Sequence, residues 1–586
     1  MNKRHFLAAV SFSSVPISIG RLFTVLLFLL VLGAFKCSHV AADGPQNVLL
    51  VVNEDSLESL AIANHYIALR SIPKQNVVYL KNIRVLPKFK GVSISAPQFW
   101  QDIYLPIVKA IEERGLENQI DCIAYSAGFP NKVACNLEQQ KYLKVHNKKF
   151  SKVYHSPILS LTGATFIGDD LVAKVPTFFD RHWNWYCRND GVSRPFSCTT
   201  GWKQNADPDL TGKTGRRYRL SCKLAVVRPK ASSLQDAIKQ ISRSAGADGT
   251  HPKGVFYFAK HKDPRSRTRQ AGFPPAAEAL RALGQKVEIG EEKMPMNQQV
   301  NGVTLGSPFL DWKKSGSKFV PGAFCDNFTS YGAVFRQNQT KLTHFLDHGA
   351  AMATGMVCEP YTIRSKIPSP FAHVHYVRGC TILESIYQTV QNPYEILIVG
   401  DPLCRPFARF PKFKIAGIKN GANVGKKFEI SVEPDASEDI KACQIYIDGI
   451  FQSDVPAREK IRIETDNLGG GVHQLVVAVV GSESSGPTAT KSIEFNVGGN
   501  VPKLKVFPQQ SEYKLDQEIL IQSTEVKANQ ITVWHNSRAI GKLNVEAPLK
   551  IRARQLGPGP VKLYATVNRG TTTVTGPTTQ LTISAN

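Results

Sequence analysis

The strongest constraint on this chain is an alternation of strand and helix patterns that fills residues 47–399. Residues 47–53 (NVLLVVN) form a continuous apolar stretch, as a strand covered on both faces requires. Apolar residues at helical spacing follow from Leu57 to Ile67, and residues 76–80 form a second strand pattern. The helix must end before Pro73, because the residue ahead of a proline avoids the helical conformation. These residues predict a βαβ unit.

The same alternation continues along the chain. Further strand patterns occupy residues 120–126, 220–227, 254–258, 286–289, 350–357 and 395–399. The helical patterns among them occupy residues 98–114, 233–242, 276–283, 342–347 and 382–389. Such alternation predicts an α/β domain with a doubly wound, mostly parallel sheet, which we expect over residues 43–411. Functional sites of such sheets lie at the carboxyl ends of the strands.

Residues 130–218 interrupt this rhythm and indicate a long surface insertion. The segment is rich in lysine, glycine, proline and aromatic residues, and residues 182–186 read HWNWY. Loops of this length are usually functional or disordered. The aromatic run predicts a packed core inside the loop, with a platform that stacks on sugars or peptides as the alternative.

After Pro411 the hydrophobic pattern changes to period two, as in half-buried strands. The tail also repeats itself at an offset of 88 residues, so that Gly469 and Gly471 recur as Gly557 and Gly559. Two copies of an all-β unit predict tandem immunoglobulin-like sandwiches over residues 412–499 and 500–586. Modules of this kind usually act as spacers or adhesive surfaces.

The amino terminus predicts export. Lys3, Arg4 and Arg21 precede an uncharged apolar run over residues 22–35, which is too short to cross a bilayer, and small residues follow at positions 40–42. This pattern is typical of a signal peptide over residues 1–42, with an uncleaved membrane anchor as the alternative. We therefore expect the protein in the periplasm, at the cell surface or outside the cell.

Ten cysteines remain after residue 42, an even number that permits disulfides in an oxidising compartment. Cys187 and Cys198 form the best candidate pair, because they flank a polar loop that contains glycine and proline. Cys122 and Cys443 fall inside apolar strand patterns and are expected to be buried. No cysteine and histidine spacing indicates a zinc site, and no cofactor motif is present.

The formal net charge is +25, and most of the basic excess precedes residue 412. It gathers in residues 141–152, 213–219 and 260–269. Such clusters favour acidic partners, among them anionic envelope polysaccharide, lipid head groups and acidic proteins. Nucleic acid is not expected, because the clusters lack interleaved aromatics and no nucleic-acid motif occurs.

An ordered set of short motifs resembles an uncharacterised family of exported bacterial proteins associated with exosortase-carrying genomes. The first motif is NEDSLESLAIA at residues 53–63, followed by Tyr66, Arg70 and Asn76. The later motifs are FVPGA at 319–323, TSYG at 329–332, GAA at 349–351, EPY at 359–361 and GDPL at 400–403. The resemblance spans residues 46–407 and implies no established activity.

The order of the closing elements is also similar to the caspase-like domain of gingipain-type cysteine peptidases, which an immunoglobulin-like module follows. In those enzymes a histidine ends one strand and a cysteine ends its neighbour. Here Gly306-Ser307-Pro308 stands near the place of the histidine motif, without an imidazole, and Cys325 follows an apolar run. The resemblance thus implies a caspase-like fold and makes Cys325 the candidate nucleophile.

Four residues are candidates for catalysis. Cys325 is paired with His261, which follows a strand and would lower the thiol pKa. Glu359 and Asp401 each end an apolar strand ahead of a proline, where two carboxylates could act as acid and base or bind a metal. His373 and His375 would share one side of a strand, but a third metal ligand is lacking, so we predict no metal site.

Two functions of different class are compatible with the sequence. The first is a non-enzymatic envelope or extracellular protein that binds an acidic polymer, glycan or protein through its basic α/β domain. The second is a secreted cysteine peptidase-like hydrolase that uses Cys325. A thiol next to a reachable imidazole would favour the second, and a buried, inert thiol would favour the first.

Overall fold

The computed structural model of this protein describes residues 44–83, 93–174, 176–180, 182–188, 190–209, 214–498, 501–523, 531–543, 547–570 and 572–585. The predicted signal peptide, residues 1–42, lies outside these ranges. Within them, no helix has the length and apolar character needed to cross a membrane.

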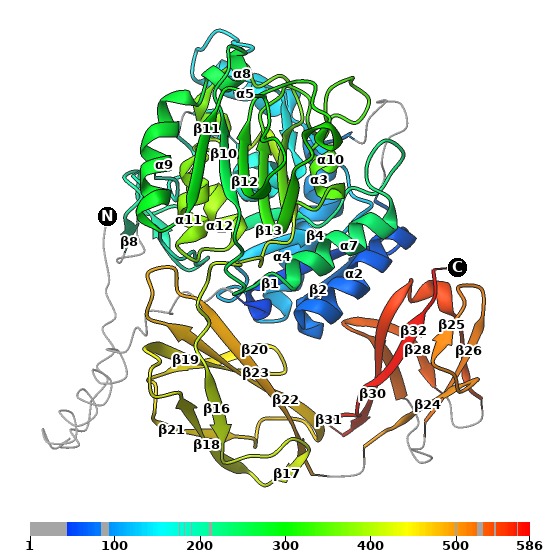
Figure 1. The fold of residues 1–586 in the computed structure, drawn as a ribbon. Coiled ribbons are helices and arrows are strands. Elements are labelled where there is room, and N and C mark those ends of the chain that lie inside the picture. The colour runs from blue at the N-terminus through cyan, green and yellow to red at the C-terminus, as the bar shows by residue number, and fades with distance from the viewer. Residues whose placement is uncertain are drawn as a thin grey trace, which may run out of the picture. The chain divides into compact units, whose positions relative to one another are not determined.

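A ten-stranded sheet forms the centre of the amino-terminal domain (Figure 1). Its strands, in spatial order, are β11 (Lys286–Gly290), β10 (Val255–Ala259), β12 (Gln299–Leu305), β13 (Lys318–Asn327), β14 (Met352–Met356), β15 (Ile396–Gly400), β9 (Leu220–Lys223), β4 (Cys122–Tyr125), β1 (Val48–Asn53) and β2 (Val77–Leu80). The α/β expectation is therefore confirmed, and all strands of this sheet except β12 and β13 coincide with strand patterns of the sequence.

The sheet consists of two parallel halves that run in opposite directions. All neighbouring strands are parallel except β14 and β15, which are antiparallel. The carboxyl ends of β10, β12, β13 and β14 therefore lie at the same edge as the amino end of β15. The opposite edge holds the carboxyl ends of β15, β9, β4 and β1. Each edge is a separate place where a site could form.

Helices cover the sheet in two groups. The first comprises α2 (Leu57–Arg70), α7 (Leu234–Ala245) and α10 (Leu342–Asp347), and the second comprises α6 (Leu161–Ile167), α9 (Phe273–Ala282), α11 (Phe371–Val377) and α12 (Ile382–Tyr387). The remaining helices are α3 (Ala96–Phe99), α4 (Leu105–Glu113), α5 (Asn136–Val145) and α8 (Pro264–Arg267). Ser56 is the N-cap of helix α2, and its side chain accepts a hydrogen bond from the backbone amide of Ser59.

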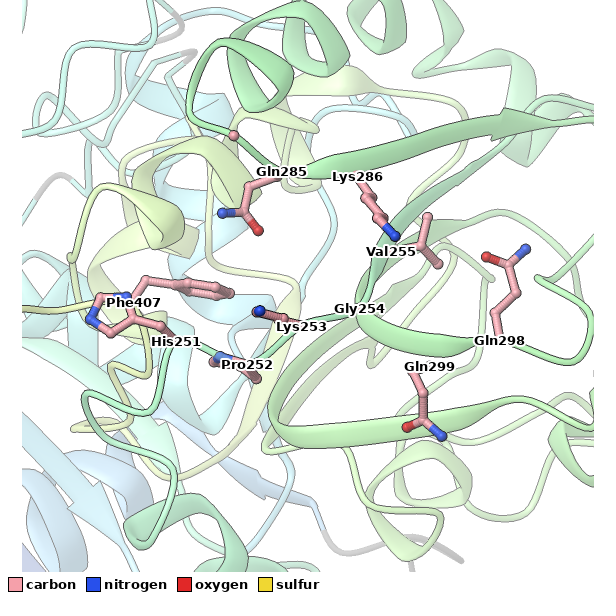
Figure 2. A pocket seen from close by; sticks show the side chains of 11 residues that line it. His251, Pro252, Lys253, Gly254, Val255, Gln285, Lys286, Gln298, Gln299 and Phe407 are labelled. Atoms are coloured by element: carbon pink, nitrogen blue, oxygen red, sulfur yellow. The ribbon is translucent and has the colours of Figure 1, made fainter.

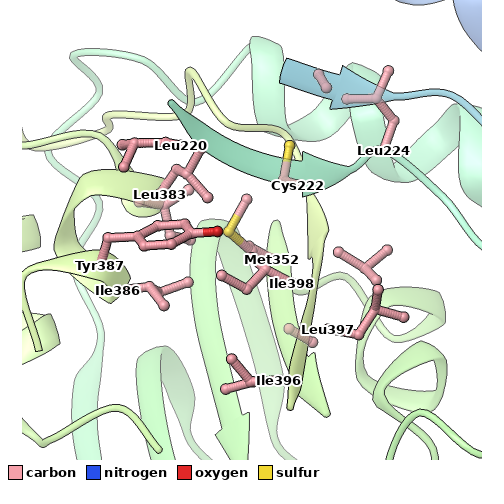
Figure 3. Packing of buried hydrophobic residues seen from close by; sticks show 14 of the residues in the cluster. Leu220, Cys222, Leu224, Met352, Leu383, Ile386, Tyr387, Ile396, Leu397 and Ile398 are labelled. Atoms are coloured by element: carbon pink, nitrogen blue, oxygen red, sulfur yellow. The ribbon is translucent and has the colours of Figure 1, made fainter. Parts of the chain in front are cut away.

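The two halves of the sheet share one hydrophobic core. Figure 3 shows Cys222 of β9, Met352 of β14 and Ile398 of β15 packed beside Tyr387 of α12. The Tyr387 hydroxyl donates a hydrogen bond to the backbone oxygen of Ser221 at 3.0 Å. Helix α12 therefore covers the junction at which the strand direction reverses.

The predicted insertion folds against the domain. It contributes β5 (Lys132–Ala134) and β6 (Ile158–Ser160), which form a small sheet with β3 (Ser93–Ser95), and a short pair, β7 (Gly201–Trp202) and β8 (Pro208–Asp209). Trp183 is buried, and the guanidinium of Arg216 lies 3.8 Å from its ring centre and 4.1 Å from that of Trp185. Because the aromatic run is packed inward around an arginine, the packed-core alternative fits it better than the platform.

Two all-β modules follow, as the repeat predicted. In the first, a sheet of β16 (Phe413–Ala416), β18 (Lys427–Pro434) and β21 (Lys460–Glu464) shares a core with β17 (Ala422–Val424), β19 (Ile440–Ile447), β20 (Ile450–Val455), β22 (Gly471–Gly481) and β23 (Thr488–Val497). In the second, β24 (Leu504–Phe507), β26 (Glu518–Ser523) and β29 (Leu549–Arg552) pack on β25 (Glu512–Tyr513), β27 (Ile531–His535), β28 (Arg538–Leu543), β30 (Gly559–Arg569), β31 (Thr572–Thr575) and β32 (Thr579–Ile583). Strands β22 and β30 begin at glycines 88 residues apart. Both modules are two-sheet, immunoglobulin-like sandwiches.

The cysteine expectations have a mixed outcome. Cys122 in β4 and Cys443 in β19 are buried, as predicted. The predicted Cys187–Cys198 disulfide is wrong for this structure, because both residues carry free thiols. The Cys198 thiol points instead to the backbone oxygen of Glu117, 3.6 Å away, while its amide donates to Asp121. Contacts to residues 117 and 121 thus hold Cys198 in place without a disulfide.

Candidate functional site

The carboxyl ends of β12 and β13 are the place where the peptidase resemblance puts a histidine and a cysteine. These strands are parallel neighbours, and they end at Leu305 and Asn327. Beyond them, the Ser307 amide donates to the Asn327 side-chain oxygen at 3.2 Å, and the Asn327 amide group donates back to the Ser307 backbone oxygen at 3.1 Å. Both residues are buried. A reciprocal pair of hydrogen bonds therefore joins the two strand ends.

Helix α8 closes this edge from outside. A side-chain carbon placed on Gly306 would lie 2.4 Å from the backbone nitrogen of Ser266 in α8, so only glycine fits there. The Ser266 hydroxyl in turn donates to the backbone oxygen of Ala259, at the end of β10. The helix is thus fixed across the end of β12, and it leaves no room for a substrate at Gly306.

A buried ion pair lies next to this contact, at the ends of β12 and β13. Arg269 bonds to Asp326 of β13 and to the backbone oxygen of Leu305, and both charged side chains are almost fully buried. The Thr354 hydroxyl donates to the second oxygen of Asp326. A buried pair with these extra hydrogen bonds is costly to break, because removal of one partner leaves an uncompensated charge. The carboxyl ends of β12 and β13 are therefore closed by structural polar contacts.

Cys325 lies inside the sheet and not at its edge. It pairs with Val303 of β12 on one side and Ala353 of β14 on the other, and its exposed fraction is 0%. Burial raises the pKa of the Cys325 thiol well above its ordinary value, and the neighbouring Arg269 guanidinium offsets only part of that rise. Because the thiolate is the nucleophile, such a thiol is inert.

His261 does not reach Cys325. It follows β10, which β12 separates from β13, so the two strands lie about 10 Å apart. The His261 Nδ1 accepts a weak hydrogen bond from the Asp263 amide at 3.4 Å, and its amide donates to Ser266. Burial lowers the pKa of the His261 imidazole. The structure therefore keeps the predicted nucleophile and base apart.

We expect Cys325 to resist alkylation by iodoacetamide in the folded protein and to react only after denaturation. Its full burial and raised thiol pKa are the physical reason. Mass spectrometry of peptides labelled before and after unfolding measures this, with half-buried Cys358 as an internal comparison. Rapid native labelling of Cys325 that His261→Ala abolishes would restore the peptidase hypothesis.

Glu359 and Asp401 lie at opposite edges of the sheet, which corrects the expectation that they adjoin. Strands β14 and β15 are antiparallel, with Met356 opposite Ile396 and Met352 opposite Gly400. Glu359 therefore follows the end of β14 at the carboxyl edge, where it accepts a hydrogen bond from the Tyr361 amide. Asp401 lies at the other edge, so the two carboxylates cannot act as one acid–base or metal-binding pair.

Asp401 is fully buried in an ion-pair network. It accepts hydrogen bonds from the Tyr66 hydroxyl and the Arg70 guanidinium, both on α2, and from the Leu403 amide. Arg70 also pairs with Asp248. The network ties the segment after β15 to the helix that follows β1. Asp401 therefore positions this segment.

The two candidate imidazoles of residues 373 and 375 lie on helix α11, not on a strand. His373 bonds to the Thr304 hydroxyl at 3.1 Å, whereas His375 bonds to the Ser193 hydroxyl at 2.9 Å. Burial lowers the pKa of each to about 3. Both are neutral structural side chains that contact different segments.

An open hollow of about 710 Å³ lies at the amino ends of β10, β11 and β12. Figure 2 shows Phe407, Lys253 and Gln285 around it, each from a different segment of the chain. Lys286, at the start of β11, adds a second ammonium group. The other residues that line the hollow are His251, Pro252, Gly254, Val255, Gly284, Gln298 and Gln299.

The lining is cationic and rich in amides. Lys253 and Lys286 are exposed, and among the residues that the structure describes none of those lining the hollow is acidic, although the Gln298 amide donates to the Glu288 carboxylate at 2.7 Å. A second hollow of about 460 Å³ shares His251, Gln285 and Phe407 with the first. It adds Arg378 and Arg409 and one acid, Glu483. We name the two hollows together the amino-end cleft.

The Asp401 network supports one wall of this cleft. The Arg405 amide donates to Asp248 at 2.9 Å, and the His251 amide donates to the backbone oxygen of Pro406 at 2.9 Å. These bonds join the segment that carries Phe407 to the one that carries His251 and Lys253. Gly254 closes the floor, because a side-chain carbon there would lie 3.0 Å from the backbone nitrogen of Asn301.

Sequence reasoning missed the amino-end cleft because it looked for sites only at the carboxyl ends of strands. The signal was present: Lys253, Gln285 and Lys286 stand directly ahead of or at the start of two predicted strands. Arg269 and Asp326 were also missed as a pair, since nothing in their spacing links them. Lys223, at the carboxyl end of β9, is a further buried cation, and burial lowers its pKa to about 7.

No protein-family model matches this chain, and no curated protein matches its sequence. Among solved structures, the fibronectin(III)-like modules of Clostridium thermocellum CbhA show 14% identity over 30% of this chain and 93% of theirs, with a TM-score of 0.14. Bacteroides ovatus SGBP-B, solved with a mixed-linkage heptasaccharide, shows 13% identity over 30% and 46%, with a TM-score of 0.20. Dimeric latent PorU from Porphyromonas gingivalis shows 12% identity over 33% and 23%, with a TM-score of 0.13. Likenesses of this size carry no functional argument, and they place the chain in no family.

Proposed function

We propose that this protein is an exported binding protein that holds an acidic glycan in the amino-end cleft and does not act as a peptidase through Cys325. The observation that carries the proposal is the lining of the cleft, in which ammonium groups, side-chain amides and Phe407 face one open space. The expected ligand is a polysaccharide that contains uronic acids, from the cell envelope or its surroundings.

Each part of the lining suits such a ligand. Lys253 and Lys286 offer charge-assisted hydrogen bonds to carboxylates, which are stronger than neutral ones. The amides of Gln285, Gln298 and Gln299 can donate to and accept from sugar hydroxyls. The open form of the hollow suits a polymer chain that extends beyond it. A buried apolar pocket would be expected for a drug-like ligand instead.

The peptidase alternative lacks this support. Cys325 is sealed within the sheet, and Ser307 and Asn327 bond to each other at the strand ends where the peptidase resemblance requires an open site. Glycan binding therefore uses the open edge of the domain, and the closed edge serves stability.

We further propose a caspase-like, doubly wound α/β domain over residues 43–411 and sandwich modules over 412–499 and 500–586. Two features support these domain boundaries. The first sandwich begins at Phe413 of β16, and the second boundary falls between β23, which ends at Val497, and β24, which begins at Leu504. The sandwiches would act as spacers that present the α/β domain. Membership of the exported, exosortase-associated family rests on the ordered motifs between residues 53 and 403.

The binding proposal is tested with Lys253→Gln combined with Lys286→Gln. We expect the affinity for polygalacturonate to fall at least about tenfold, because one charge-assisted bond is worth roughly 1.5 kcal/mol. Isothermal titration calorimetry at low salt measures the affinity, and neutral dextran should not bind detectably.

The matched control is Lys313→Gln combined with Lys314→Gln, which removes the same charge from an exposed turn outside the cleft. This control should retain the affinity of the unmodified protein. Equal losses in both double variants would mean that overall charge, and not the amino-end cleft, attracts the polymer, and the proposal would then be wrong.

A further inference from the structure

We infer that helix α5 and the segment after it, residues 136–152, form a surface that docks on an anionic phospholipid bilayer. This surface, named the α5 surface, lies in the insertion and includes no residue of the amino-end cleft. It combines exposed apolar side chains with lysines, a combination that peripheral membrane proteins use at the lipid interface.

The apolar component is concentrated. Leu137, Val145 and Phe150 are 60%, 57% and 53% exposed, and they lie within one short stretch of chain. Among the other large apolar residues that the structure describes, only Phe309 is as exposed. Isolated exposed apolar residues are normal, but a group of them marks an interaction surface.

Helix α5 is fixed so that its lysines and its exposed apolar side chains face outward. Tyr142 is fully buried, and its hydroxyl donates to Asp180 at 2.6 Å. Glu138, the one acid of residues 136–152, is also buried. Residues three or four apart share a helix face, which places Lys141, Lys144 and Val145 together on the exposed side.

The charge of the α5 surface complements anionic head groups. Its five lysines are Lys141, Lys144, Lys148, Lys149 and Lys152, and all of them are exposed. Lys148 contacts Asp180 at 3.3 Å, whereas the other four contact no acidic side chain among the residues that the structure describes. Each lysine close to an anionic membrane raises binding by a factor of roughly five.

The apolar side chains decide between a bilayer and a soluble polyanion. A hydrated polymer gains nothing from Phe150 or Leu137, which would stay in water. A bilayer interface removes such side chains from water, and complete burial of one of them strengthens binding by at least about tenfold. Of these two occupants, only the bilayer uses both the lysines and the apolar residues.

The test is co-sedimentation of the protein with vesicles of phosphatidylglycerol and phosphatidylcholine. It uses the chain without residues 1–42, so that their apolar run does not contribute. Binding should appear with the anionic vesicles and be absent with pure phosphatidylcholine. We expect Lys144→Gln with Lys149→Gln to weaken binding about 25-fold. Phe150→Ser should weaken it about tenfold.

Two control variants carry the same changes outside the α5 surface: Lys313→Gln with Lys314→Gln, and Phe309→Ser at another highly exposed phenylalanine. Both should bind the vesicles like the unmodified protein.

Weaker vesicle binding by Lys144→Gln with Lys149→Gln, together with unchanged binding by Phe150→Ser, would assign the α5 surface to a soluble polyanion and overturn the proposal. Vesicle binding that no α5 variant weakens would also overturn it. The amino-end cleft variant Lys253→Gln with Lys286→Gln should leave vesicle binding intact, so the two proposals can fail separately.

Discussion

Replacement of Arg269 with methionine is expected to lower the free energy of unfolding of the α/β domain by about 3–5 kcal/mol. Methionine fills much of the space of the arginine stem but leaves the Asp326 carboxylate buried without a cation. Asp326 is fixed on β13 between two parallel neighbours, so it cannot turn toward water. Urea unfolding followed by tryptophan fluorescence measures the loss, with Trp312 buried in the same domain.

The double variant Arg269→Met with Asp326→Asn provides the matched control. Neutralising the orphaned carboxylate should recover more than half of the lost stability, because the pair is then removed as a whole. A single variant as stable as the unmodified protein would show that the carboxyl edge is open to water. That result would contradict a closed edge at β12 and β13.

Asp401→Asn is expected to cost about 3 kcal/mol of stability and also to weaken glycan binding. The change leaves the buried Arg70 guanidinium with Asp248 as its remaining carboxylate partner. The segment that carries Phe407 then loses the charged link that Asp401 makes with α2 and keeps the link that runs through Asp248. Thermal unfolding and calorimetric titration with polygalacturonate measure the two effects.

Asp263→Asn is the control for this change, because Asp263 is partly exposed and pairs with Arg265 only within its own turn. It should alter stability by less than about 1 kcal/mol and leave binding unchanged. If Asp401→Asn abolished a hydrolytic activity while the unfolding temperature stayed the same, Asp401 would be a catalytic residue. A positioning role predicts that stability and affinity fall together.

Much of the fold follows from local pattern. Strands such as β1 and β15 are continuous apolar runs, and the glycine repeat in the tail marks two sandwiches because similar glycine-containing turns recur at one spacing. Strand β12 was missed because Asn301 and Gly302 break its apolar run. Helix α11 was mistaken for a strand because it is only seven residues long and mixes histidines with apolar residues, so that periodicity could not distinguish the two.

The candidate site was harder to predict because it depends on strand direction. Sequence patterns place Glu359 and Asp401 after two consecutive strands, but they do not reveal that β14 and β15 are antiparallel. Because of that reversal, Asp401 lies at the same edge of the sheet as the amino-end cleft. Likewise, the burial of Cys325 depends on its neighbours in β12 and β14, which lie far from it in the sequence.

The central claim is that ligands bind at the amino ends of β10, β11 and β12 and not at the carboxyl ends of β12 and β13. Hydrogen exchange with mass spectrometry, with and without oligogalacturonate, tests it most directly. We predict that the ligand slows exchange in residues 251–256 and 284–300 and leaves residues 305–309 and 325–330 unchanged. Slower exchange confined to residues 305–309 and 325–330 would contradict the account.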